Sequence, residues 1–159
     1  MYTQPLEVNN LERDGNRNRD ASHLYLQWDT FTTAERGGYA ISDILYELQI
    51  KKAGTSTWST VSDRIPATEA TKFAVTSSNP VGLVLGQEYE FRIFAYSRLD
   101  GCRSPPSQTE RITHALEPAA PTCIATANSH PKIVVSFQPA DDNKSKINYY
   151  KIWAKNGQG

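Results

Sequence analysis

The run Glu88–Ser97 (EYEFRIFAYS) alternates two sets of side chains along ten consecutive positions. A period of two places successive side chains on opposite faces of an extended strand, whereas a helix needs apolar residues three or four positions apart. The side chains that share one face here are Tyr89, Phe91, Ile93 and Ala95. The run therefore predicts a long strand with that face in a core and with Glu90, Arg92 and Phe94 on the other face.

Shorter runs of the same kind recur along the chain, separated by turns rich in Gly, Pro, Asn and Ser. They cover residues 23–29, 45–51, 58–61, 73–75 and 108–113, after a short apolar start at Leu6 and Val8. No segment keeps a helical period. Seven short strands at spacings of about 8–14 residues predict an all-β chain folded as an antiparallel sandwich. The polar stretch 12–22 between the first two strands is interpreted as a solvated loop, with a docking loop as the alternative.

The composition excludes some classes of function. The 159 residues hold 17 Lys and Arg against 17 Asp and Glu, a formal net charge of zero. A nucleic-acid-binding protein carries a basic excess on some segment, so this balance favours protein partners. No apolar run reaches the roughly 18 residues of a membrane span, and the first 20 residues contain no apolar signal segment.

The strand pattern stops at a short proline-alanine connector and then starts again. Phe137 follows aliphatic residues as Trp28 does, 109 positions earlier, and Tyr150 repeats Tyr46 at an offset of 104. This internal repeat of about 105 residues indicates tandem modules. The predicted division is a complete module over residues 1–115, a linker over 116–121, and the first three strands of a second, truncated module over 122–159.

The order of these motifs resembles the fibronectin type III family, an immunoglobulin-like antiparallel β-sandwich. The resemblance rests on three motifs, which are Leu26-x-Trp28, Tyr46-x-Leu48-x-Ile50 and Leu85-x-x-x-Tyr89-x-Phe91-x-Ile93-x-Ala95. The resemblance implies a tyrosine corner in which the Tyr89 hydroxyl bonds to backbone near Leu85. It also implies a structural core that includes Trp28, Tyr46, Leu85, Tyr89, Phe91, Phe137 and Tyr150.

The second module is too short to be complete by the family's pattern. About 42 residues follow the first module, against roughly 90–110 for a whole sandwich of this kind. Three strands would leave apolar residues such as Ile133 and unpaired strand edges uncovered. We expect either that the chain is a piece of a longer modular protein or that another polypeptide completes the fold.

Neither catalytic nor metal-binding chemistry is predicted. His23, His114 and His130 are not paired with a nucleophile, and they have no metal-ligand spacing with another residue. The pair Asp141-Asp142 lies in a turn without the further oxygen ligands that calcium needs. We therefore expect no enzyme activity, no cofactor and no metal.

The two cysteines are predicted to remain unpaired with each other. The strand that separates Cys102 from Cys123 would hold them more than about 25 Å apart, whereas a disulfide needs Cα atoms within about 7 Å. Free thiols favour a reducing compartment, such as that of a cytoskeletal or other large intracellular assembly. An extracellular or cell-surface location is the alternative, so the sequence leaves the localisation unknown.

The leading functional hypothesis is a non-enzymatic spacer and protein-binding scaffold within a larger modular protein. Neighbouring modules or other proteins are the expected partners, with no nucleic acid and no membrane span in this segment. The candidate contact residues are Arg36, Tyr39, Asp100 and Arg103, because their loops should emerge at the same pole and because Tyr and Arg are common at binding hot spots. The alternatives are a cell-surface adhesion or receptor ectodomain that binds a ligand through its loops, and an accessory module of a secreted or phage or bacterial surface enzyme.

Overall fold

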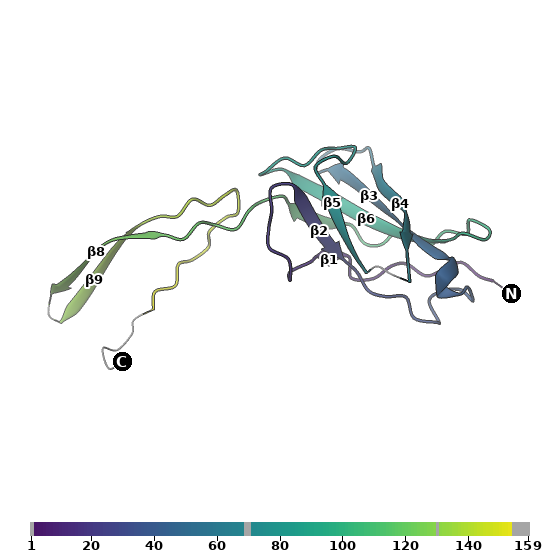
Figure 1. Ribbon diagram of the computed structural model, residues 1–159, viewed down its shortest axis with the longest axis horizontal. Coiled ribbons are helices and arrows are strands. Elements are labelled where there is room, and N and C mark those ends of the chain that lie inside the picture. The colour runs from purple at the N-terminus through teal and green to yellow at the C-terminus, as the bar shows by residue number, and fades with distance from the viewer. Residues whose placement is uncertain (1, 69–70, 130, 154–159) are drawn as a thin grey trace.

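Figure 1 shows a sandwich of strands from which a separate β-hairpin extends at the C-terminal side. The computed structural model describes residues 2–68, 71–129 and 131–153. Its strands are Glu12–Arg13 (β1), His23–Gln27 (β2), Ile44–Lys52 (β3), Ser59–Pro66 (β4), Lys72–Thr76 (β5), Glu88–Ser97 (β6), Glu110–Thr113 (β7), Thr122–Ser129 (β8) and Lys132–Gln138 (β9). The only helical turn in this part of the chain is the 3-10 helix Ile41–Asp43 (η1).

Two antiparallel sheets form the sandwich. One has the strand order β1-β2-β5 and the other the order β4-β3-β6-β7. The β3–β6 ladder is the longest, since it pairs nine residues of β3 with β6 from Ile44 opposite Ser97 to Lys52 opposite Tyr89. The predicted all-β antiparallel sandwich is therefore the observed architecture.

The alternation in β6 fills the space between the sheets as predicted. Tyr89, Phe91, Ile93 and Ala95 are all fully buried. They meet the inward residues of β3 and the side chains of Leu26 and Trp28, and the Trp28 ring packs edge-on against Tyr46 with 5.4 Å between ring centroids. Burial of aromatic and aliphatic side chains from both sheets supplies most of the driving force for this fold.

The tyrosine corner forms, but Leu85 is not part of the core. The Tyr89 hydroxyl donates to the Gly82 carbonyl and accepts from the Val84 amide, each at 2.8 Å. A turn then closes from the Gln87 amide to the Val84 carbonyl, with Gly86 at a φ of +84°. Leu85 sits at the corner of this turn and is 37% exposed, so the prediction for Leu85 was wrong. Leu83, two residues earlier, packs against the core instead.

The polar stretch 12–22 is only partly a solvated loop. It begins with β1, and it buries the carboxylate of Asp14 against the Lys72 ammonium at 3.0 Å. The Asp14 amide also donates to the Tyr25 carbonyl at 2.9 Å. Residues 15–18 are exposed, as predicted. The charged residues of this segment thus anchor it to the three-stranded sheet.

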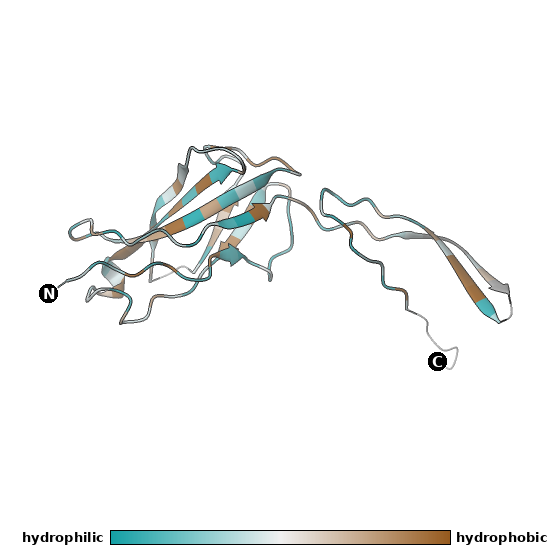
Figure 2. Ribbon diagram, turned by 180° about the vertical axis from the view of Figure 1, so that it is seen from behind, coloured by the Kyte–Doolittle hydropathy of each residue, from teal (hydrophilic) through white to brown (hydrophobic). Residues whose placement is uncertain are grey.

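Beyond the sandwich, β8 and β9 pair as an antiparallel hairpin, and the apolar residues of β9 stand apart from the sandwich core (Figure 2). The predicted third strand is not formed over residues 150–153, and residues 154–155 lie outside the described chain. A strand needs a hydrogen-bonded neighbour, and the described residues supply none for it.

Phe137 and Tyr150 are therefore not core residues in this structure. Their rings contact each other, with centroids 5.0 Å apart, but Phe137 is only half-buried and Tyr150 is 38% exposed. No second sheet covers them among the described residues, so their burial was predicted wrongly. The domain boundaries themselves remain a prediction.

Candidate protein-binding surface

The predicted contact residues Tyr39 and Asp100 do meet at one pole of the sandwich. The Tyr39 hydroxyl donates to Asp100 Oδ2 at 2.8 Å. Tyr39 is only 4% exposed, because the ring of Tyr2 stacks on it with centroids 4.5 Å apart and an interplanar angle of 6°. The expectation that Tyr39 is an exposed contact residue was therefore wrong: its ring is buried and its hydroxyl joins two loops.

Asp100 remains exposed, but both of its oxygens are already engaged. Its Oδ1 accepts the Cys102 amide at 3.0 Å. That hydrogen bond, followed by the one from Tyr39, holds the pKa of the Asp100 carboxyl below its usual range. Burial and the neighbouring Asp100 charge raise the pKa of Tyr39, so the phenol stays protonated. Cys102 beside them is a free thiol, and the side chain of Cys123 lies outside the described part of the chain.

Arg36 and Arg103 lie away from that hydrogen bond. Arg36 is half-buried and bonds within its own loop, from Nη2 to Thr33 Oγ1 and from Nε to the Thr32 carbonyl. Arg103 turns onto the outer face of the four-stranded sheet, where its guanidinium lies 3.6 Å from the centre of the Phe94 ring. Two of the four candidate residues are thus brought together, and the other two are not. A partner-contacting role for any of them remains a prediction.

On the outer face of the four-stranded sheet, cations alternate with aromatic rings. We call Trp58, Arg92, Phe94 and Arg103 the cation–aromatic ladder. The Arg92 guanidinium lies 4.3 Å from the Trp58 ring centre and 5.1 Å from that of Phe94. Phe94 is only 7% exposed because Arg103 covers it.

Hydrogen bonds fix the cations of the ladder in place. Arg92 Nε donates to Gln49 Oε1 at 2.8 Å, and Arg103 Nη2 lies 2.6 Å from Glu47 Oε2. Burial and the nearby Arg103 lower the pKa of the Arg92 guanidinium. The result is a surface on which guanidinium groups alternate with aromatic rings. Such a surface suits protein recognition, since Trp and Arg are enriched at binding hot spots.

Buried Glu90 continues this polar surface toward β7. It accepts from Lys51 Nζ at 2.7 Å and from Arg111 Nη2 at 2.6 Å. These two partners hold the pKa of the Glu90 carboxyl below its usual range. The alternation in β6 places Glu90, Arg92 and Phe94 on the outer face, as the sequence predicted. Their contacts with Trp58, Lys51 and Arg111 depend on strand pairing and were not predicted.

The described residues contain no metal-binding constellation. No three His, Cys, Asp or Glu side chains in ranges 2–68, 71–129 and 131–153 gather closely enough to hold an ion. His23 Nδ1 pairs with Asp20 Oδ2 at 2.9 Å, His114 is buried with Nε2 3.1 Å from the Asp20 carbonyl, and His130 lies outside the described residues. A search of the same part of the chain for a helix long and apolar enough to cross a membrane finds none.

Neither a family model nor a curated protein matches the chain. Solved structures do match. The FN1–FN3 domains of chicken CNTN1 align with a TM-score of 0.55 at 15% identity, over 86% of this chain and 44% of that one. The kinase region of twitchin from C. elegans aligns with a TM-score of 0.52 at 20% identity, over 83% of this chain and 19% of that one. Domains A168–A170 of titin align with a TM-score of 0.50 at 21% identity, over 71% of this chain and 33% of that one.

The chain thus spans less than half the length of each of these structures. At these identities the likeness bears on the fold alone. On that evidence, the chain has a fibronectin type III/immunoglobulin-like β-sandwich fold.

Proposed function

We propose that this chain is a fibronectin type III segment of a larger modular protein, and that it works without catalysis as a spacer and protein-binding scaffold. The fold is of a kind found in modular muscle and adhesion proteins, which are the sources of the structural neighbours. The observation that carries the spacer role is the set of contacts at the junction between the sandwich and the β8–β9 unit.

At that junction, the turn 141–145 of the second unit holds the connector. Asn143 Nδ2 donates to the Glu117 carbonyl at 2.7 Å, and the Asn143 carbonyl accepts the Leu116 amide at 3.2 Å. The Ala119 amide donates to the Asp141 carbonyl at 3.0 Å. Asn143 adopts a φ of +47°, a conformation that Asn tolerates better than most residues. The connector is therefore tied along its length to the second unit.

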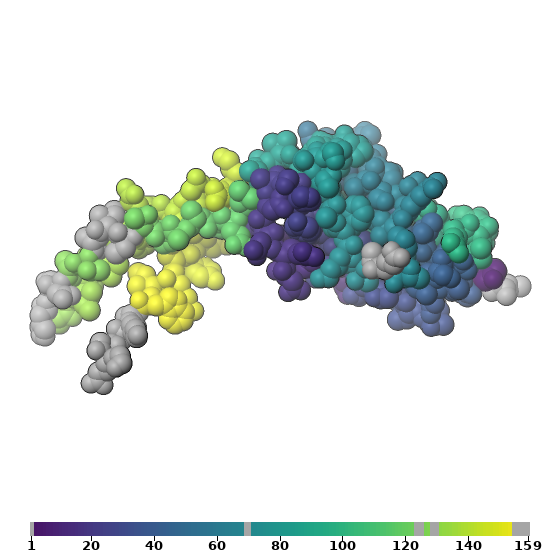
Figure 3. All heavy atoms as spheres, viewed as in Figure 1, coloured from purple at the N-terminus to yellow at the C-terminus, as the bar shows by residue number. Residues whose placement is uncertain are grey.

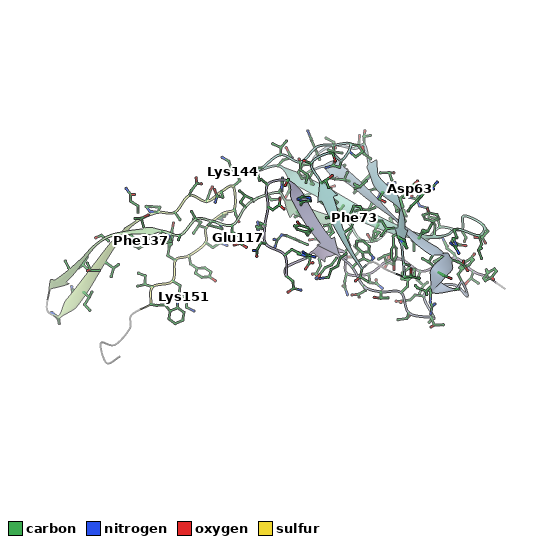
Figure 4. All side chains as sticks on the ribbon, in the orientation of Figure 1. Asp63, Phe73, Glu117, Phe137, Lys144 and Lys151 are labelled. Atoms are coloured by element: carbon green, nitrogen blue, oxygen red, sulfur yellow. The ribbon has the colours of Figure 1, made fainter. Side chains whose placement is uncertain are left out.

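The same turn also touches the sandwich. Arg19 Nη1 lies 3.5 Å from Ser145 Oγ, and the stem of Lys144 lies next to Gly86. Figure 4 labels Lys144 on the turn beside the sandwich. A side chain at Gly86 would meet Lys144 Cγ at 3.3 Å. Figure 3 shows the atoms of this region abutting the N-terminal part of the sandwich. Contacts to both neighbours restrict the angle between the two units, which is what a spacer of defined geometry requires.

The spacer role can be tested by measuring that angle. We would place spin labels on Thr55→Cys and Lys132→Cys, in a background with Cys102→Ser and Cys123→Ser, and record the distance distribution by electron–electron resonance. A single narrow distribution is expected, and Asn143→Ala should broaden it. Asn148→Ala is the matched control, since exposed Asn148 makes none of the hydrogen bonds named above. A broad distribution in the unaltered junction would contradict the proposal.

A further inference from the structure

The outer edge of β7 is unpaired in the described structure. β7 ends the four-stranded sheet and pairs only with β6. The His114 amide donates to the Gln87 carbonyl at 2.9 Å, and the His114 carbonyl accepts the Gly86 amide at 2.8 Å, so both groups point toward β6. Because these directions alternate along an antiparallel strand, the N–H and C=O groups of Arg111 and Thr113 point away from β6. They form a template for one more strand.

This edge lies in a groove between the two sheets. Residues 7–12, which lead into β1, face residues 107–110 at one end, around a volume of about 340 Å³. At the other end, Arg13 and Arg19 face residues 110–113, Ala115 and the turn residues 144–146, around about 430 Å³. We call these two depressions, which share Glu110, the β7 groove. Because residues 7–12 and 144–146 line these depressions beside β7, a single extended chain fits there better than the edge of a whole module.

The β7 groove has opposite charges at its two ends. Glu7 and Glu12 line the first depression, and Glu110 lies where the two depressions meet. Burial together with the Glu12 charge raises the pKa of Glu110. Arg13, Arg19, Lys144 and Lys146 lie at the other end, and none of these four cations has a carboxylate of the described residues within 4 Å. Burial and the charge of Arg19 lower the pKa of Arg13. None of the salt bridges among the described residues therefore joins the charges of either end to an opposite charge.

We propose that the β7 groove binds an extended peptide as an added antiparallel strand, with acidic residues in the N-terminal half of the peptide and basic residues in its C-terminal half. β7 runs from the acidic end at Glu110 to the basic end at Thr113. An antiparallel peptide therefore begins at the cations and ends at the carboxylates. The backbone of Arg111 and Thr113 supplies the hydrogen bonds, and the charge order sets direction and selectivity. This assigns a class of partner to the proposed scaffold and is tested separately from the spacer geometry.

The test uses two fluorescein-labelled ten-residue peptides of identical composition on the whole chain. One has Asp and Glu alternating with Val in its N-terminal half and Lys alternating with Val in its C-terminal half. The other has the two halves exchanged. Fluorescence anisotropy should show the first peptide binding at least about tenfold more tightly, equivalent to about 1.4 kcal/mol. Equal affinities, or no binding of either peptide, would overturn the proposal.

Two pairs of variants locate the site. Thr113→Pro removes an outward N–H that β6 does not use, so it should weaken binding of the first peptide about tenfold or more. Thr113→Ala keeps that amide and should bind the peptide as tightly as the parent does. Arg19→Glu with Lys146→Glu should abolish the preference for that peptide. Lys52→Glu with Lys132→Glu makes the same change in net charge elsewhere on exposed residues and should leave the preference intact. Thermal unfolding checks that each variant is folded.

Two other occupants would be revealed by the same variants. Heparin that competes for the basic end and binds Thr113→Pro undiminished would show a polyanion patch in place of a peptide site. A dimer of the chain in sedimentation that Thr113→Pro dissociates would show that a second copy takes the edge. Either result would overturn the peptide proposal, and neither would change the spin-label distances that test the spacer role.

Discussion

The Tyr39 hydroxyl donates a hydrogen bond to Asp100 Oδ2 at 2.8 Å and thereby joins two loops that lie 61 residues apart in the chain. Tyr2 stacks over the same ring and covers it. The pole that the sequence nominated for partner contact is thus held together by one of its own candidate residues. A partner at this pole would meet ordered loops.

The hydrogen bond at this pole predicts local protection. Tyr39→Phe keeps the stacked ring but removes the donor, so the loop around Asp100 and Cys102 should open more often. Amide hydrogen exchange at Asp100–Arg103 should become about two- to tenfold faster, the range expected for loss of one net hydrogen bond. Tyr2→Phe keeps the two stacked rings and does not alter this hydrogen bond, so it serves as the control. Unchanged exchange in Tyr39→Phe would mean that the hydroxyl does not hold the loops.

The tyrosine corner predicts a larger effect on global stability. Tyr89→Phe leaves the Gly82 carbonyl and the Val84 amide without their partner at a part-buried corner. Loss of the hydroxyl should lower the free energy of unfolding by about 1–3 kcal/mol with an unchanged m-value in urea. The same substitution at Tyr149, which is largely exposed, should change it by no more than about 0.5 kcal/mol.

The two halves of the internal repeat should differ sharply in their sensitivity to truncation. Phe91→Ala removes a fully buried ring from the sandwich core and should lower the free energy of unfolding by about 3–5 kcal/mol. Phe137→Ala removes a half-buried ring that contacts Tyr150, and it should cost less than about 1 kcal/mol in the main unfolding transition. Denaturant unfolding followed by Trp fluorescence measures both. Equal costs would show that the β8–β9 unit shares the sandwich core.

The buried Asp14 carboxylate predicts an acid-dependent part of the stability. Its hydrogen bond with Lys72, and then that with the Asn16 amide, hold the pKa of Asp14 below its ordinary value despite burial. The folded state therefore binds this proton more weakly than the unfolded chain does. The stabilisation is present above the unfolded pKa of about 3.9 and is lost as the pH falls through the lower folded value.

Asp14→Asn should accordingly be less stable than the parent at pH 6, and the difference should shrink as the pH approaches 2. Unfolding midpoints in urea at several pH values measure this. Asp29→Asn, on an exposed side chain, is the control with the same change of charge. A difference between Asp14→Asn and the parent that stays constant from pH 6 to pH 2 would contradict the assignment.

Much of the sandwich follows from patterns that are local in the chain. The alternation of Tyr89, Phe91 and Ile93 predicts both the strand and its buried face. The resemblance to fibronectin type III modules placed the tyrosine corner on the right residue. Leu85 was misplaced because its exposure depends on a turn at Gly86, whose positive φ a pattern of apolar spacing does not reveal.

The same patterns misjudged residues whose burial depends on distant segments. Tyr39 lies in a loop, where polarity and position suggested exposure, but Tyr2 and Asp100 come to it from opposite ends of the first module. Phe137 and Tyr150 repeat the spacing of core residues without a second sheet to cover them in the described structure. A repeat in sequence predicts which side chains need burial, and only the packing shows whether they obtain it.

The sequence by itself predicted the long strands of the sandwich and their inward faces, because a two-residue period is a property of the local backbone. The tertiary structure decided which outward residues meet. The placing of Arg92 between Trp58 and Phe94 depends on the register of three strands, and the opposite charges of the β7 groove depend on the approach of β1 to β7. Register and sheet packing arise from contacts between residues far apart in the chain, which no local period encodes.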